Sequence, residues 1–319
     1  MDGQFKPIFD KLADVMNAKD LRASRFLHEM CGGLHLMLTV YRRGTDEDLF
    51  KFYTGLYKWA DNQDPDILDQ LVQRTQERYP LNNEEIDTYF VMSHKWRVKI
   101  NHWVNMKLAE RHEHKLFIKS PGEMPGIMMQ PQDMWIWEGM ELLCHRRKYV
   151  ANSPVNGGIY TIYSLDPETI TLRLNKEYLE NYRPKAPKPP KDAKANEVDD
   201  EDEDATSEPD DFEEDEEELP KAPKGFKCID MAGWYTVTHA EFARIFRPQH
   251  ALVYPSIQGR TMREKHICLL DTGNRHFTSR HLIVATSRAT HGKYVHVPDR
   301  EQEATVKKDA DRLAAVRMR

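Results

Sequence analysis

The chain has 319 residues, and its 46 lysines and arginines against 52 aspartates and glutamates give a formal net charge of −6. Fifteen of the acidic residues and no basic residue lie between Asp199 and Glu218, so the rest of the chain has 46 basic and 37 acidic residues, or +9. A basic body is compatible with a polyanionic partner, although an ordinary solvated surface has the same composition. The four cysteines form no CxxC pair, which excludes a disulfide scaffold and argues against a zinc knuckle.

No apolar run approaches the roughly 18 residues that a membrane span needs. The chain is polar within its first four residues, so we expect no signal peptide. The prediction is a soluble intracellular protein, or a piece of one, with no membrane partner.

The N-terminal part, residues 1–84, is predicted to be helical because its apolar residues recur at steps of three and four. Asp64 followed by Pro65 predicts the start of a helix that runs to Tyr79, with Asp64 as the N-cap and proline at the first helical position.

The next segment has the pattern of a strand followed by a helix. Residues 88–93 are rich in β-branched and aromatic side chains, which favours a buried strand, and residues 95–110 change to a helical period. This is half of a βαβ unit in a parallel sheet. Later segments predict two more strands (250–254 and 266–271), a helix (281–288), a last strand (294–297) and a frayed, charged helix at the end. The predicted fold class is therefore α/β, with sheet strands on both sides of an interruption.

The interruption has two parts. Short strands separated by turn residues over 131–182 predict a small antiparallel barrel. Residues 183–224 combine a Pro/Lys-rich stretch with the acidic run, which predicts a disordered linker because proline and dense like charge oppose a packed core. A solvated tether is the simpler interpretation of this linker, and a docking tail that mimics nucleic acid is the other.

Common catalytic constellations are absent from the sequence, which has no G-x-S-x-G and no HExxH motif. His112 and His114 project about 200° apart on a helix, so they are a poor metal pair. A phosphate loop of the GxxxxGK[ST] type is also missing, because Gly292-Lys293 is followed by Tyr294 and Ser287 occupies the place of the first glycine. The chain therefore cannot bind a nucleoside triphosphate in that way unaided.

Two segments have side chains suited to phosphate chemistry. In 252–261 (LVYPSIQGRT), a strand leads into a turn where Gly259 allows close backbone approach and Gln258 and Thr261 offer uncharged hydrogen bonds. In 283–291 (IVATSRATH), Arg288 ends an apolar helix, and a guanidinium there suits a developing phosphoryl charge. Taken singly, each segment is equally well an ordinary loop, or a helix with a surface salt bridge.

Taken in order, these segments resemble the C-terminal half of a superfamily 1 DNA helicase of the RecD-like branch. Residues 252–261 resemble motif V, with Tyr254 in place of the usual histidine, and 283–290 resemble motif VI. Residues 38–50 resemble motif IV, with Arg42 as the better match for its arginine. Residues 2–8 resemble the end of motif III through Gln4 and Pro7.

The resemblance implies a fold and its boundaries. It implies a second RecA-like domain, interrupted by an SH3-like barrel and the acidic insert. The implied segments are a helical region with the motif IV-like part (1–84), RecA-like domain 2A (85–130 and 248–300), the SH3-like 2B insertion (131–182 and 225–247), the linker (183–224) and a charged tail (301–319). Motifs I, Ia and II, which carry the Walker lysine and the acid that binds Mg²⁺, would precede Met1.

The resemblance also implies roles for individual residues. Arg288 and Arg42 would sense the γ-phosphate of ATP as catalytic arginines. Gln258, Gly259 and Gln4 would contact or couple to the nucleotide. Single-stranded DNA would be contacted by four residues: Thr261, Ser93, His94 and Arg97. ATP and Mg²⁺ would bind only in combination with a P-loop RecA-like domain, covalent or in trans, and the implied direction of travel is 5′ to 3′.

The sequence leaves two other functions open. One is a non-catalytic module, derived from a helicase, that binds single-stranded nucleic acid or a protein. Aromatic residues such as Trp135 and Trp137 would then stack on bases, unless they belong to the core of the barrel. The other is an inactive truncated product. The retained Arg288 and its surrounding pattern favour descent from a working motor.

Overall fold

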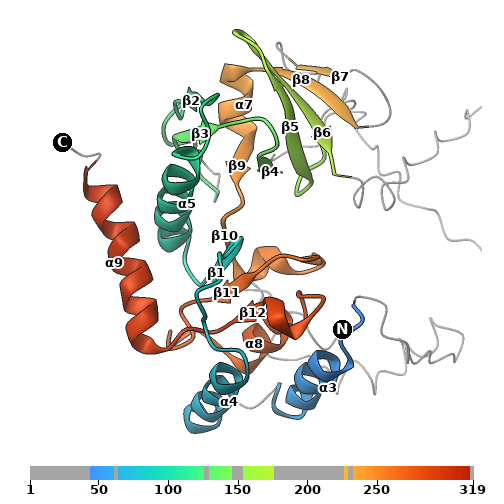
Figure 1. Cartoon of the computed structure of the whole chain (residues 1–319), viewed down its shortest axis with the longest axis vertical. Coiled ribbons are helices and arrows are strands. Elements are labelled where there is room, and N and C mark those ends of the chain that lie inside the picture. Colours follow the sequence, from blue (N-terminus) through green and yellow to red (C-terminus); the bar gives the residue numbers. More distant parts are fainter. Residues whose placement is uncertain are drawn as a thin grey trace, which may run out of the picture. The chain divides into compact units, whose positions relative to one another are not determined.

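The computed structural model describes residues 44–60, 64–125, 129–145, 154–175, 226–228 and 233–316 (Figure 1). It divides into two compact units. One combines Met1–Trp137 with Phe246–Arg319, and the other is Glu138–Ile245. Gln4, Arg42 and the acidic run lie outside the described residues. Among the described helices, none is long and apolar enough to cross a membrane.

The first unit is built on a four-stranded parallel sheet with the order β10-β1-β11-β12. Its strands are β1 (Thr88–Val91), β10 (Ala251–Val253), β11 (Ile267–Leu269) and β12 (Val295–His296). One strand precedes the interruption and three follow it, so the predicted parallel α/β sheet is confirmed. A short strand, β9 (Phe246–Pro248), leads into β10.

Helices cover both faces of this sheet, which explains why its strands are apolar without alternation. On one face, α5 (His94–Ala109) and α9 (Arg300–Val316) pack over a core that includes Tyr89, Val91 and Val253. The alternate residue Phe90 faces the opposite side, where its ring lies 6.1 Å from that of Tyr254. Tyr254 in turn packs on Phe277, next to α8 (Ser279–Thr286). The sheet is therefore the middle layer, with α5 and α9 on one face and α8 on the other.

The last helix differs from the prediction. Instead of a frayed tail, α9 is a 17-residue helix that lies beside α5 (Figure 1). Its Ala310 is fully buried against the sheet core, and Asp311 forms an ion pair with Lys99 of α5. Although many residues of α9 are charged, one side of the helix packs against α5. This packing, rather than helix propensity, stabilises the helix.

One of the two described helices before the sheet has the start that the sequence predicted. In α4 (Pro65–Arg78), the Asp64 side chain accepts a hydrogen bond from the Asp66 N–H at 3.0 Å, and Pro65 is the first helical residue. α3 (Glu47–Gly55) is followed by the 3₁₀ turn η2 (Leu56–Trp59). The N-cap of α3, Asp46, also accepts a hydrogen bond from the Gly292 N–H at 2.7 Å, which ties this helix to the segment before β12.

A two-stranded antiparallel ribbon, β2 (Leu116–Ile118) and β3 (Met134–Ile136), also belongs to the first unit. The Asn105 side chain of α5 exchanges two 2.8 Å hydrogen bonds with the main chain of Trp135 and so holds this ribbon. Trp137 is buried and stacks on the His112 ring at 4.5 Å. Trp137 is therefore buried in the first unit and not in the core of the barrel, where the sequence had placed its structural role.

The second unit is antiparallel, as predicted, with the strand order β7-β8-β6-β5-β4. Its elements are β4 (Glu141–Cys144), β5 (Ile159–Leu165), β6 (Thr169–Leu174), β7 (Phe226–Cys228), β8 (Trp234–Thr238) and the helix α7 (His239–Ile245). Buried and less buried residues alternate along β6 and β8, so one face of this sheet is packed and the other is open. An SH3-like closure of these strands stays a prediction, as do the segment boundaries given above.

A buried histidine at the start of β10 predicts an acid-labile fold. Nε2 of His250 is buried without a hydrogen-bond partner, and burial, aided by Lys265, lowers the pKa of His250 to about 4. The unfolded chain therefore takes up this proton first as the pH falls below about 6.5, and stability is lost progressively down to about pH 4. The expected loss is about 3 kcal/mol. Burial also lowers the pKa of His281 to about 4, so more than one histidine contributes in this window. In denaturant unfolding at pH 7 and pH 4.5, His250→Asn should remove the share of His250, about 3 kcal/mol, and an unchanged loss of stability would contradict the assignment.

Candidate functional site at the carboxyl edge of the sheet

Three strands end at the same edge of the parallel sheet, and predicted site residues follow two of them. The strands are β10, β1 and β11, and parallel pairing brings their carboxyl ends together. Ligands of open parallel sheets bind at this edge. The described candidates at this edge are Gln258, Gly259 and Thr261 after β10 and Ser93, His94 and Arg97 after β1. Arg288 follows the other end of α8, on the way to β12, and meets the turn after β10 through its hydrogen bond to the Arg260 carbonyl.

The turn after β10 exposes the predicted motif V residues. The 3₁₀ turn η3 (Tyr254–Ile257) ends at Gln258, and both Gln258 and Gly259 are exposed. Gly259 has φ +76°, with open space where a Cβ would stand. Glycine is therefore needed here for its backbone conformation and not to avoid a clash. Arg260 turns back, and its Nε donates to the Ser256 carbonyl at 2.7 Å. An exposed backbone turn with an amide side chain can hydrogen-bond a phosphate or a sugar.

Arg288 is buried, and its guanidinium is held by hydrogen bonds. Nε donates to the Val284 carbonyl at 2.9 Å, and Nη2 donates to the Ser287 hydroxyl at 2.9 Å. Nη1 donates to the Arg260 carbonyl at 3.1 Å. The first two bonds lie within the end of α8, but the third reaches the turn after β10. Arg288 therefore has a fixed position, and its bond to the Arg260 carbonyl reaches beyond its own helix.

The main chain joins the same two segments. The Met262 N–H donates to the Arg288 carbonyl at 2.9 Å, and Met262 and Ala289 form a parallel bridge. The motif V-like and motif VI-like segments are therefore neighbours through both main-chain and side-chain bonds, although about 30 residues separate them in the sequence. A shift of the Gly259 turn would act directly on the Arg288 guanidinium.

The start of α5 holds three predicted residues with different environments. The Ser93 side chain accepts a hydrogen bond from the Trp96 N–H at 3.2 Å and caps the helix. His94 is half-buried, its Nδ1 has no hydrogen-bond partner, and burial together with the nearby Arg97 charge lowers its pKa. Arg97 has no exposed surface, and none of its three guanidinium nitrogens has a hydrogen-bond partner among the residues that the structure describes. Burial lowers the pKa of Arg97 to about 10, so the side chain stays charged at neutral pH.

Helix geometry places Arg97 near the carboxyl edge. Asn101 exchanges two hydrogen bonds with the main chain of Ala251, at 3.1 and 2.8 Å, so this turn of α5 is level with the start of β10. Arg97 precedes Asn101 by four residues, or about 6 Å of helix toward Ser93. Helical side chains also lean toward the N-terminus of their helix. The buried guanidinium therefore lies toward the end of β10, where the turn with Gly259 begins.

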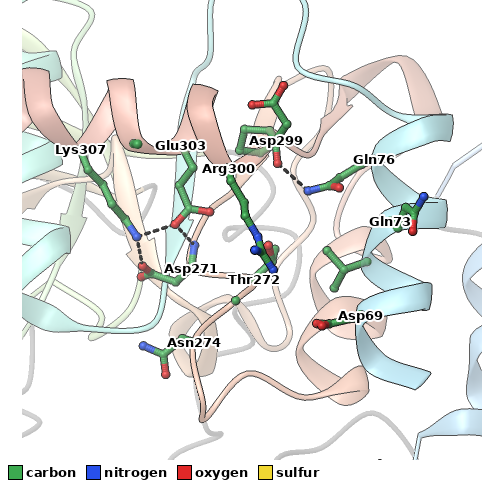
Figure 2. A pocket seen from close by; sticks show the side chains of 14 residues that line it. Asp69, Gln73, Gln76, Asp271, Thr272, Asn274, Asp299, Arg300, Glu303 and Lys307 are labelled. Carbon is green, nitrogen blue, oxygen red and sulfur yellow. Dashed lines mark hydrogen bonds and ion pairs between the residues drawn. The ribbon is translucent and has the colours of Figure 1, made fainter. Parts of the chain in front are cut away.

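A cavity of about 770 Å³ lies at the carboxyl end of β11, between α4 and α9 (Figure 2). Asp271 lies at its inner end with φ +61°, which is a strained conformation for a non-glycine residue. One Asp271 oxygen accepts the Met92 N–H at 2.8 Å, and the other is 2.6 Å from Nζ of Lys307. Glu303 pairs with the same lysine and accepts the Asp271 N–H at 3.1 Å. Burial alone lowers the pKa of Lys307, but the hydrogen bonds to Asp271 and Glu303 outweigh it, and the net shift is upward.

Removing this lysine should destabilise the first unit. The Asp271 side chain is 4% exposed and that of Glu303 is 16% exposed, so Lys307→Met leaves two poorly solvated carboxylates together. We expect a loss of about 3 kcal/mol in the free energy of unfolding. The triple variant with Asp271→Asn and Glu303→Gln should recover most of it, since the repelling charges are gone. Denaturant unfolding measures both, and a Lys307→Met protein as stable as the parent would refute the network.

Asp271, Glu303 and Lys307 were not predicted as site residues. The signal for Asp271 was its place directly after the buried strand, while the two residues of α9 gave none because their segment reads as a charged tail. Arg288 does not line this cavity, so the cavity is separate from the phosphate-sensing role predicted for that residue. The described part of the chain contains no cluster of three or more side chains able to hold a metal ion.

Neither a protein-family model nor a curated protein matches this sequence. Solved structures similar to the chain include the Pif1 helicase from Candida albicans, with 14% sequence identity and a TM-score of 0.46 over 98% of this chain and 67% of that chain. Bacteroides Pif1 bound to ssDNA has 14% identity and a TM-score of 0.41, and Bacteroides Pif1 in complex with ADP-AlF3 and ssDNA has 17% and 0.40. Each Bacteroides match covers 82% of this chain, which spans about half the length of those proteins (51%).

Proposed function

We propose that this chain forms the second RecA-like domain, with an SH3-like insertion, of a superfamily 1 DNA helicase of the RecD-like branch. The observation that supports it most is the hydrogen bond from Nη1 of Arg288 to the Arg260 carbonyl. This bond links the arginine expected to sense a γ-phosphate to the turn expected to contact DNA. A motor needs such a link, because the nucleotide state has to change the grip on the strand.

In this proposal ATP lies between the chain and a P-loop RecA-like domain that supplies the phosphate loop and the Mg²⁺ ligand. A buried, always-charged guanidinium fits the terminal phosphate, since it adds no reorganisation at the moment of transfer. Arg288 would exchange its contact with the Arg260 carbonyl for a phosphate oxygen. Arg42 would supply the second arginine, and Gln4 would complete the nucleotide contacts.

Single-stranded DNA would cross the same edge of the sheet. Thr261 and Ser93 would offer uncharged hydrogen bonds, and His94 and Arg97 follow Ser93 in the first turn of α5. Gln258 and Gly259 would transmit the movement of Arg288 to this grip. The proposed direction is 5′ to 3′.

The test is ATP hydrolysis with single-stranded DNA, for the whole chain alone and mixed with the P-loop domain of a related helicase. We expect no turnover alone and DNA-stimulated turnover in the mixture. If the mixture is inactive and the chain still binds single strands, the motor fails and the non-catalytic binding module takes its place. If the chain binds no strand at all, both proposals fail.

A further inference from the structure

The open face of the second unit's sheet carries an aromatic pair beside an unpartnered arginine. Tyr163 of β5 is 65% exposed, and its ring lies 4.8 Å from that of Trp234 of β8 at 85°. The Arg173 guanidinium of β6 lies 5.0 Å from the centre of the Trp234 ring. The three side chains come from three adjacent strands, because β6 lies between β5 and β8.

The strand register explains why these side chains meet. Arg173 pairs directly with Trp234 on one side and with Thr161 on the other, and directly paired residues share a face. The register of β5 against β6 shifts between Ile162 and Ser164, so Tyr163 is the extra residue of a bulge. A bulge re-aims the side chain that it carries. Here it leaves a large ring more exposed than any other large apolar side chain among the described residues.

Arg173 brings to this face a positive charge that no carboxylate in the described part of the chain pairs with. Arg173 has no hydrogen bond or ion pair among the described residues, and its Nε is buried without a partner. The one acid on the same cross-strand row, Glu141, accepts a hydrogen bond from the Asn175 amide at 3.4 Å. A hollow of about 260 Å³ opens between Tyr163, Arg173 and Asn175. A flat exposed ring beside a guanidinium to which the described residues offer no carboxylate partner suits an unpaired base with its phosphate, because bases stack on aromatic faces and arginine pairs with phosphate.

We propose that Tyr163, Trp234 and Arg173 form a second binding site for single-stranded nucleic acid, in which a base stacks on Tyr163 and Arg173 pairs with the adjoining phosphate. The site differs from the Trp135 and Trp137 stacking considered from the sequence, since both tryptophans belong to the first unit. It requires neither ATP nor the γ-phosphate role of Arg288. This proposal can therefore be tested independently of the proposed motor function.

The test measures binding of a fluorescein-labelled oligothymidine to the full chain by anisotropy, without nucleotide. Tyr163→Ala should weaken binding about tenfold, while Tyr163→Phe, which keeps the ring, should bind as the parent does. Arg173→Gln should lower the slope of log K against log salt by about 0.7. Tyr57→Ala removes an aromatic of the first unit that is 36% exposed and should change nothing.

A photo-crosslink with 5-iodouracil in the oligonucleotide locates the contact. Adducts on the peptides that contain Tyr163 or Trp234 are expected, and they should persist in a Ser93→Ala, Thr261→Ala double variant of the first unit. The proposal is overturned if Tyr163→Ala binds like the parent, or if every adduct lies in the first unit. Failure of the motor would instead show as absent ATP turnover with these adducts intact.

Discussion

Arg288→Ala should abolish DNA-stimulated ATP hydrolysis by the chain mixed with a P-loop domain, with a fall in kcat of about 10³-fold or more. A guanidinium aimed at the γ-phosphate stabilises charge that develops only in the transition state, so its removal lowers kcat while ATP affinity changes less. The position of Arg288 supports this expectation. Its guanidinium is already desolvated and oriented by the Val284 and Arg260 carbonyls, so it enters the reaction without losing solvent.

Two controls separate catalysis from folding. Arg288 also makes structural bonds, so thermal unfolding must show that the variant is folded before its kcat is compared. Arg288→Lys keeps the charge but loses the fork that bonds Val284 and Arg260 together, and it should recover little activity. Arg275→Ala removes an exposed arginine and should leave turnover unchanged. If the kcat of Arg288→Ala is within tenfold of the parent value, Arg288 is not the arginine sensor, even if the mixture itself is active.

The parallel sheet was predictable because its strands are buried on both faces. Continuous apolar runs such as residues 88–91 and 267–269 leave no alternating period, and this is typical of strands with helices on both sides. A local signal at a helix end was also confirmed, since Asp64 caps α4. The prediction of a frayed tail was wrong for the residues of α9. The few apolar residues by which this helix packs, such as Ala310, can be recognised only when the position of α5 is known.

The candidate site was predictable where a short segment carries its own chemistry. The 252–261 turn and Arg288 are such cases, and each was recognisable from residue type and order. What no sequence pattern gives is the pairing between them, because it depends on a side chain reaching a main-chain carbonyl at Arg260. The burial of Arg97 and the Asp271–Lys307 pair likewise depend on packing between distant segments.

Arg97→Met should make the protein more stable and a poorer binder of single-stranded DNA. A charged side chain that has no exposed surface, and no hydrogen-bond partner in the described part of the chain, carries an uncompensated desolvation penalty. An unbranched apolar side chain of similar length fills the same space without that penalty. We expect the free energy of unfolding to rise by about 2 kcal/mol and Tm by about 5 °C. Lys95→Met, two residues away and exposed, should change neither quantity by much.

The DNA affinity of Arg97→Met tests whether the buried charge of Arg97 serves DNA binding. If Arg97 meets a DNA phosphate, Arg97→Met should lower the slope of log K against log salt by about 0.7, whereas Arg97→Lys should preserve it. Stability and binding would then move in opposite directions, which is the signature of a group kept for function at the expense of the fold. A variant that is stabilised but binds DNA with the parent affinity and salt slope would show that Arg97 does not contact the strand. A destabilised variant would show that the guanidinium finds partners in the folded chain.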